Sequence, residues 1–298
     1  MVFPLCSSKP QEDDLCEWIC RCTLNHKLDA PFARDSSHLE KRGIGQMTIS
    51  ATIITLNEER NIARCIQSLL PVVDEILVLD AHSSDRTVEI ATSLGAKVSV
   101  RDWAGYSASK NAINALASCD YILSIDADEA LDEVLQQEII RIKKSNENKV
   151  YSLNRLTNYC GRWILHSGWY PDVKVRIFPR IGVKWVGEFV HEELAFEQTM
   201  NVEQLGGQLE HYSYYNVVEH RQRADKYSLL TARKMHEQGK KAGILKPYFS
   251  AAGRFFAMYV IKLGILDGVM GWKIATISAA SNVLKYKELR RLNRENAA

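Results

Sequence analysis

Apolar and polar residues repeat with two different periods between residues 49 and 144, which indicates strands and helices in turn. Short runs of β-branched and apolar residues predict strands at residues 49–56, 75–79, 97–100 and 121–125. Between them, apolar residues recur every three or four positions and predict helices at residues 58–70, 86–94, 106–117 and 131–144. Strands that alternate with helices form right-handed βαβ units, so an α/β structure with a mostly parallel sheet flanked by helices is expected.

The pattern changes after residue 149, where strands are no longer separated by helices. Further strands are predicted at residues 150–155, 173–178, 183–186 and 208–212. A loop at residues 157–171 lies between the first two and contains Trp163, His166, Trp169 and Tyr170. Simple extension of the sheet would explain these strands, but the aromatic loop is also suited to stacking on sugars.

The last third of the chain is helical and basic. Helices are predicted at residues 220–238, 248–263 and 272–285, with glycines between the second and the third. From His220 to the C-terminus there are 16 Lys and Arg against 5 Asp and Glu, a balance of +11, whereas the preceding residues carry 22 against 31, or −9. Apolar helices with basic flanks are typical of a membrane interface, although packing against the preceding domain remains the alternative. No groove-reading motif accompanies the charge, so nucleic acid is not expected as the partner.

Residues 1–46 show no sustained period and contain several prolines and glycines, so we expect an extension outside the fold, with the working protein beginning near Met47. There is no basic segment followed by an apolar core at the start, and no uninterrupted apolar run of transmembrane length. These features favour a cytoplasmic protein that binds peripherally to the inner face of the membrane. The seven cysteines are irregularly spaced and are best interpreted as free thiols.

Polar side chains stand where three of the predicted strands end: Asn57 and Glu58, then Asp80, then Asp126, Asp128 and Glu129. In an open α/β sheet, ligands bind in the crevice outside the carboxyl ends of the strands. Asp126 and Asp128 are two residues apart and point to the same side if the chain is still extended, where they could hold Mg²⁺ or Mn²⁺. Capping of the next helix is the alternative. The sequence lacks the glycine-rich signatures of dinucleotide enzymes and P-loop NTPases.

Three motifs in this order resemble the family 2 inverting glycosyltransferases, which have the GT-A fold. They are Ile54-Thr55-Leu56-Asn57-Glu58-Glu59, Leu79-Asp80-Ala81-His82-Ser83-Ser84-Asp85-Arg86-Thr87, and Asp126-Ala127-Asp128. Later segments resemble the subgroup of lipopolysaccharide-core β-1,4-glucosyltransferases: Gly168-Trp169-Tyr170-Pro171-Asp172, Arg176-Ile177-Phe178 and Val190-His191-Glu192. The resemblance implies a GT-A domain over residues 47–215, with a nucleotide-binding half (47–145) and an acceptor half (146–215). Residues 216–298 would form the helical, membrane-associating C-terminal region.

The resemblance also implies roles for individual residues. The nucleotide sugar would be bound by Thr55, Leu56, Asn57, Glu58, Asp80, Lys110, Asp126 and Ala127. Within this set, Asp80 would accept from the uracil N–H and Asp126 would hold the ribose, while Asp128 would bind the Mg²⁺ or Mn²⁺ that bridges the diphosphate. Inversion requires a general base on the far side of the sugar, for which Glu192 is the first choice and Asp172 the second. The acceptor would contact Trp169, Tyr170 and His191.

The expected activity is therefore metal-dependent, inverting transfer of a sugar, with glucose as the first choice, from a UDP-sugar donor. The acceptor would be a lipid-linked glycan, the lipopolysaccharide inner core, at an anionic membrane surface. Two alternatives stay open at this point. A polyprenyl-phosphate sugar synthase would use the same first half, and a non-catalytic nucleotide-sugar-binding protein would keep the fold without the chemistry.

Overall fold

The computed structural model describes residues 46–145, 147–187, 193–197 and 200–295. Nearly all of the expected N-terminal extension lies outside these residues, and so do His191 and Glu192. Met47 is already buried, and its backbone N–H donates to the carbonyl of Lys143 at 3.0 Å.

Four parallel strands form the first half of the main sheet, in the order β3-β2-β1-β4. They are β1 (Ile49–Thr55), β2 (Glu75–Asp80), β3 (Lys97–Val100) and β4 (Tyr121–Asp126). The helices that connect them are α2 (Ile62–Leu69), α3 (Thr87–Ser93) and α4 (Tyr106–Asn114). Strand β1 is buried along its whole length, as expected of a central parallel strand that is covered on both faces.

Beyond β4 the sheet becomes mixed and continues in the order β8-β6-β12-β5. These strands are β5 (Glu129–Leu131), β6 (Val150–Tyr159), β8 (Asp172–Pro179) and β12 (Leu209–Tyr214). Strand β8 is antiparallel to both β4 and β6, and β12 is parallel to β6 but antiparallel to β5. Shorter strands β7 (Arg162–Trp163) and β11 (Val202–Gln204) pair with β6, and β9 (Lys184–Val186) pairs with β10 (Glu193–Ala195).

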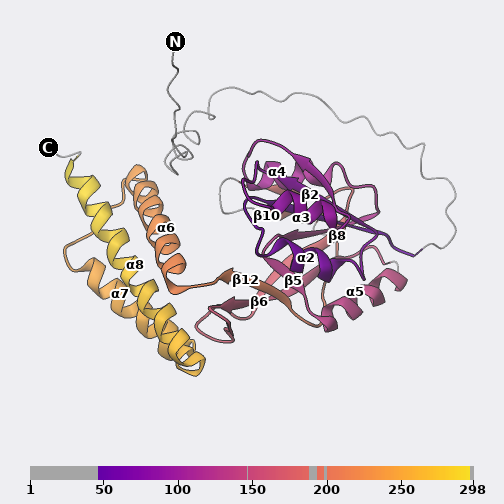
Figure 1. Cartoon of the computed structure of the whole chain (residues 1–298). Helices are drawn as coiled ribbons and strands as arrows, with labels where there is room; N and C mark the ends of the chain where they lie inside the picture. The colour runs from indigo at the N-terminus through magenta and orange to yellow at the C-terminus, as the bar shows by residue number, and fades with distance from the viewer. Residues whose placement is uncertain (1–45, 146, 188–192, 198–199, 296–298) are drawn as a thin grey trace, which may run out of the picture. The chain divides into compact units, whose positions relative to one another are not determined.

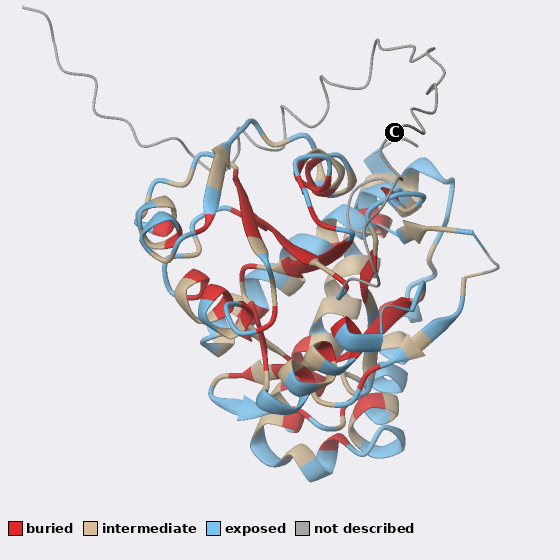
Figure 2. Ribbon diagram, turned by 90° about the vertical axis from the view of Figure 1, so that its right-hand side faces the viewer, coloured by how far each residue is buried: buried red, intermediate tan, exposed pale blue. Residues whose placement is uncertain are grey.

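Each face of the sheet has its own hydrophobic cluster (Figure 2). One face packs against α2 and α5 (Glu133–Ser145), with Ile53, Ile66 and Ile139 completely buried. The other face packs against α4 and β9, where Phe178 meets Trp185 edge to face at 6.2 Å. In β2 the side chains alternate between the clusters, with Ile76 and Val78 in the first and Leu77 and Leu79 in the second, as expected of a strand covered on both faces.

The C-terminal region consists of helices that pack along α8 (Gly268–Glu295) (Figure 1). They are α6 (Val217–Glu237) and α7 (Lys246–Phe256), which continues as a π-helical turn, η1 (Ala257–Ile261), and a 3₁₀ turn, η2 (Gly264–Asp267). A third cluster, with Tyr159, Ile164, Met258 and Ile274 buried, joins these helices to β6. The α/β fold with a mostly parallel sheet flanked by helices and a helical C-terminal region is therefore confirmed.

Three elements differ from the sequence-based expectation. Helix α2 begins at Ile62 rather than at Glu58, because residues 58–61 form a turn that bonds to the next loop. The helix predicted to begin at Leu131 begins at Glu133, because Leu131 is the last residue of β5. Helix α8 passes through Gly271 without a break. Gly271 lies against the Gly264 carbonyl, where a Cβ atom would clash, so close packing and not a helix end explains this glycine.

Candidate active site

The carboxyl ends of β1, β2 and β4 bring three predicted residues together. Thr55 is the register partner of Asp80, and Asp126 is the register partner of Ile54. Asp80 is completely buried, and its carboxylate accepts from the backbone N–H of Ser83 at 2.8 Å and from the Ser83 hydroxyl at 2.5 Å. Among the described residues, the buried Oγ1 of Thr55 has no hydrogen-bond partner, so this hydroxyl is available to a ligand in the crevice.

The loops after β1 and β2 are bonded to each other. Asn57 has a positive φ of 56°, donates its backbone N–H to Ser83 Oγ at 2.8 Å and accepts from the Ser84 N–H at 2.8 Å. Glu58 donates its backbone N–H to Thr87 Oγ1 at 2.8 Å, while its carboxylate accepts from the side chain of Asn61 at 2.7 Å. Burial raises the pKa of Glu58, against the opposing effect of this hydrogen bond. The loops therefore form a pre-organised wall, from which the Leu56 side chain points out to solvent.

Asp126 is held between two cations. Its carboxylate lies 3.2 Å from Lys110 Nζ and 2.9 Å from Arg176 Nη2. Burial would raise the pKa of Asp126, but Arg176 and then Lys110 outweigh it and hold the pKa well below its usual range. Lys110 is itself buried, and its ammonium lies 4.6 Å from the centre of the Trp185 ring. Lys110 and Asp126, both predicted from the sequence, thus lie in the site and form an ion pair with each other.

A β-bulge places Arg176. Tyr151 of β6 is paired with Ile177 and Ser152 with Val175, so Arg176 is the extra residue of β8 between two paired neighbours. Bulges of this kind redirect a side chain, and here the guanidinium enters the interior, where it also bonds Glu129 at 2.6 Å. The Glu129 side chain is fully buried, so the position of Arg176 decides whether that charge is compensated.

The ion pairs continue toward the acceptor half. Arg155 of β6 lies 3.5 Å from Glu129 and bonds Asp172, its cross-strand partner, at 2.6 and 2.8 Å. Lys174 lies 3.0 Å from the other oxygen of Asp172. Burial would raise the pKa of Asp172, but Arg155 and Lys174 lower it below its usual range. A carboxylate held in this way is a weak base.

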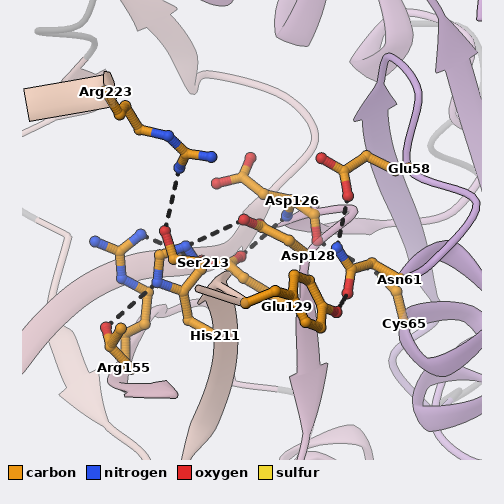
Figure 3. A network of polar contacts seen from close by, with 12 residues as sticks. Glu58, Asn61, Cys65, Asp126, Asp128, Glu129, Arg155, His211, Ser213 and Arg223 are labelled. Carbon is orange, nitrogen blue, oxygen red and sulfur yellow. Dashed lines mark hydrogen bonds and ion pairs between the residues drawn. The ribbon is translucent and has the colours of Figure 1, made fainter. Parts of the chain in front are cut away.

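Asp128 faces a histidine from a distant strand (Figure 3). Its Oδ2 lies 3.3 Å from Nε2 of His211, and its carbonyl accepts from the backbone N–H of Tyr212 at 2.8 Å. Register explains the approach, because His211 of β12 is paired with Glu129 of β5. Arg223 of α6 points toward the same group of side chains and donates to Ser213 Oγ at 3.3 Å (Figure 3).

The described residues contain no group of three or more His, Cys, Asp or Glu side chains arranged around a metal ion. Asp128 and His211 nevertheless offer one carboxylate and one imidazole ligand side by side, and both side chains are partly exposed. Mg²⁺ is commonly bound by only one or two carboxylates, with substrate phosphate oxygens and waters completing the octahedron. The residues therefore fit a cation that is shared with a bound diphosphate.

The predicted acceptor residues Trp169 and Tyr170 are partly buried and make contacts within the protein, so acceptor binding by them stays a prediction. Trp169 packs into an aromatic cluster, with its ring 5.7 Å from Tyr159 and 5.6 Å from His220. Burial lowers the pKa of His220 to about 4, and its Nδ1 lies 2.9 Å from the Tyr159 hydroxyl. The Tyr170 hydroxyl accepts from the side chains of Asn154 at 2.7 Å and Gln208 at 3.2 Å. His191 and Glu192 fall outside the described residues, so their roles stay predictions.

The strand-end residues were found from the sequence, whereas their partners were not. The additional residues are Arg155, Arg176, His211 and Arg223. Arg176 lies in a segment that carried the family resemblance. His211 and Arg223 had no local signal, because the strand pairing and the docking of α6 bring them to the site.

Comparison with known proteins gives consistent results. The family model described as Glycosyl transferase family 2 matches residues 50–189. An uncharacterized glycosyltransferase from Rickettsia bellii is 32% identical over 262 residues, which cover 82% of this chain and 87% of that protein. The lipopolysaccharide core biosynthesis glycosyltransferase LpsC from Rhizobium meliloti is 26% identical, with 85% of this chain and 98% of that protein covered.

Among solved structures, a glucosyl-3-phosphoglycerate synthase from Mycobacterium tuberculosis in complex with Mn²⁺, uridine diphosphate and glucosyl-3-phosphoglycerate is similar to part of the chain. The match has a TM-score of 0.32 at 26% identity and covers 38% of this chain and 44% of that one, too little to support an argument about the site. The ordered motifs, the family model and the full-length relatives agree, and the chain belongs to glycosyltransferase family 2.

Proposed function

We propose that this glycosyltransferase is a metal-dependent inverting enzyme that moves glucose from UDP-glucose to a lipid-linked glycan of the lipopolysaccharide inner core. The observation that carries the donor half of the proposal is the convergence of Thr55, Asp80, Asp126 and the Asp128–His211 pair at one edge of the sheet. The similarity to LpsC supports the choice of acceptor. The expected location is the inner face of the cytoplasmic membrane.

The crevice is equipped for a uridine nucleotide. A carboxylate has about four lone-pair positions, and Ser83 uses two of those on Asp80, so Asp80 keeps capacity to accept from the uracil N–H. The unpartnered Thr55 hydroxyl lies beside it in register. Asp126 stays ionised because Arg176 and Lys110 face it, and it is suited to accept from ribose hydroxyls on its remaining lone pairs.

Asp128 and His211 would hold Mg²⁺ or Mn²⁺ together with the two phosphates of the donor. A cation bound there would neutralise the charge that develops on UDP as the leaving group. Arg223 points toward the same place from α6 and adds a positive charge beside the pair (Figure 3). Asp128 directly precedes β5 and His211 lies on β12, the neighbour of β5, so the two donors would hold the cation side by side.

The chemical step requires a carboxylate that removes the proton of the acceptor hydroxyl while the sugar is displaced in line. Asp172 is paired with Arg155 and Lys174, which favours its ionised form and weakens it as a base. Its position suits a structural role between β6 and β8. We therefore assign the general base to Glu192 and treat Asp172 as a positioning residue.

The test is thermal stabilisation by a panel of UDP-sugars with and without Mn²⁺ or Mg²⁺. A donor at about 100 times its Kd stabilises the folded state by about 2.7 kcal/mol. In a domain of this size that raises the unfolding midpoint by about 5–10 °C. UDP-glucose with Mn²⁺ is expected to give the largest shift. No shift with any UDP-sugar would overturn the proposal.

Two variants test the metal assignment in the same experiment. Asp128→Ala is expected to abolish metal-dependent transfer and the metal-dependent part of the shift, and His211→Ala to raise the Mn²⁺ requirement by about tenfold. Glu138→Ala is the matched control, because this carboxylate lies on α5 and pairs with Arg141 away from the crevice. Wild-type metal dependence in Asp128→Ala would refute the assignment. Sugar transfer to a polyprenyl phosphate instead of a glycan would identify the protein as a polyprenyl-phosphate sugar synthase, the alternative from the sequence.

A further inference from the structure

The outward side of α7 and η1 is apolar and exposed. Leu245, Phe249, Phe256 and Val260 recur at helical spacing, and 62%, 72%, 54% and 47% of their surface is accessible. The opposite side of the same segment is buried against α8 and contributes Met258 to the third hydrophobic cluster. One apolar stripe of this segment is therefore packed, while the second is open to solvent and has no packing partner among the residues that the structure describes.

The turn between η1 and α8 extends this surface. Leu263, Ile265, Leu266 and Val269 are all about half to two-thirds exposed. Together with Leu245, Phe249, Phe256 and Val260 they form what we call the apolar face. Contiguous apolar surface of this kind marks a site of interaction with a protein or a membrane. Among the described helices, none is by itself long and apolar enough to cross a membrane. The helix pair Lys246–Ile261 and Gly264–Glu295, which is bent by 74°, meets the length and composition of a span only when the two are taken together.

The charges around the apolar face have one sign. Residues 239–281 contain six Lys and Arg and a single acidic residue, Asp267. The Asp267 side chain is only 3% exposed, so its charge is turned away from the solvent. Lys246 and Arg254 of α7 and Lys262 after η1 are exposed residues of this segment, which contains no exposed carboxylate. This combination is complementary to an anionic surface with an apolar interior.

Asp267 instead ties the turn to the acceptor half. Its Oδ1 accepts from the backbone N–H of Leu165 at 3.1 Å, and its Oδ2 accepts from the Ser167 hydroxyl at 2.7 Å. The backbone N–H of Ser167 donates to the Lys262 carbonyl at 2.9 Å, and a Cβ atom on Gly168 would collide with the Lys262 side chain. The loop held in this way runs directly on through Trp169 and Tyr170 to β8.

We infer that the apolar face docks on an anionic lipid bilayer, with α7 lying in the plane of the interface. The inference rests on the proposed function for the identity of the acceptor, because a lipid-linked glycan would then meet the loop that Asp267 holds. In-plane helices combine an apolar stripe with flanking basic residues, which attract anionic lipids. A second copy of the chain fits less well, because the basic borders of two such faces would repel each other.

Vesicle sedimentation of the full chain tests this inference. Wild-type protein is expected to bind vesicles of phosphatidylcholine mixed with phosphatidylglycerol much more strongly than phosphatidylcholine alone. The double variant Phe249→Ser/Phe256→Ser is expected to reduce binding to the mixed vesicles by tenfold or more. It removes two aromatic side chains that are exposed in the free protein and would be buried in the bilayer. Lys246→Gln/Arg254→Gln should weaken binding mainly to the anionic vesicles.

Ile181→Ser is the matched control, because Ile181 is 76% exposed but follows β8 at the opposite end of the strand from Asp172. Equal binding by the phenylalanine double variant and this control would overturn the inference, and so would no binding of wild type to either vesicle. A wild-type dimer that the phenylalanine variants convert to a monomer would assign the face to a second copy. Thermal stabilisation by UDP-sugars is measured separately, so loss of donor binding with intact vesicle binding would count against the proposed function alone.

Discussion

Replacing Arg176 by methionine removes the cation at the centre of the buried ion pairs. The Arg176 side chain is 5% exposed and bonds Asp126 at 2.9 Å and Glu129 at 2.6 Å. In the variant Asp126 keeps Lys110, but the fully buried Glu129 keeps a single cation, Arg155 at 3.5 Å, beside the backbone N–H of Asp126 at 2.9 Å. Methionine fills much of the volume of the arginine stem, so the main change is the uncompensated charge.

Breaking a buried pair by removing one partner typically costs about 3–5 kcal/mol, because the remaining charge stays out of water. We expect a loss of that size in the free energy of unfolding of Arg176→Met. Arg141→Met is the matched control, since Arg141 also pairs with two carboxylates, Glu138 and Glu203, but is 51% exposed. Exposed pairs contribute about 0–1 kcal/mol, so this control should lose little.

The pH dependence separates lost charge compensation from lost packing. In the wild type the pKa of Asp126 lies below that of an unfolded aspartate, about 3.9, so its stabilising contribution is complete above that value and is lost only in stronger acid. Without Arg176, burial is the largest effect on the Asp126 carboxylate and only Lys110 still opposes it, so we expect the pKa of Asp126 to rise above its unfolded value. Protonation of the Asp126 carboxylate would then remove its uncompensated charge. The loss in free energy of unfolding of Arg176→Met, relative to wild type, should therefore be largest at pH 7 and smaller at pH 5.

Urea denaturation followed by tryptophan fluorescence at both pH values measures these differences for wild type and both variants. Comparison with wild type at each pH removes the contributions of groups that titrate in all three proteins. A deficit in Arg176→Met no larger than that in Arg141→Met would refute the reasoning. A large deficit that is the same at pH 7 and pH 5 would assign the effect to packing of the arginine stem.

Two further predictions concern the acceptor half. Glu192→Gln should lower the turnover number by about a hundredfold or more while preserving thermal stabilisation by the donor, whereas Asp172→Asn should mainly reduce stability; steady-state kinetics with the reverse pattern would move the general base to Asp172. Asp267→Ala leaves the buried Ser167 hydroxyl without its acceptor and should lower the free energy of unfolding by about 1–3 kcal/mol, with partial recovery in Asp267→Asn; an unchanged urea midpoint would contradict the bond.

The parallel half of the sheet was predictable because its strands are buried on both faces. Their apolar runs are uninterrupted, and the strand Lys97–Val100 was predicted with the bounds observed. Strand β5 was missed because three residues are too few to show a period, and it is a strand only through pairing with β12, some eighty residues later. Such pairing is tertiary information that a local pattern does not contain.

The charged residues of the antiparallel strands explain the limits on predicting the site. Arg155 lies in β6 and Arg176 in β8, and these two strands pair antiparallel. In an antiparallel sheet, a charged residue normally indicates the face that is open to solvent. The bulge in β8 turns Arg176 inward, and no feature of the sequence predicts it. Trp169 shows the converse, since the composition of its loop suggested stacking on sugars whereas its ring packs against Tyr159 and His220.

The contacts of the site imply that the two halves of the catalytic domain, residues 47–145 and 146–215, depend on each other. Asp126, Asp128 and Glu129 belong to the first half, but the groups that face them on β6, β8 and β12 belong to the second. A first half folded alone would bury Glu129 without a cation and leave the edge of β4 unpaired. The buried ion pairs around Asp126 and Glu129 are therefore complete only when residues 146–215 are in place, and the proposed binding of donor and acceptor would be coupled through them.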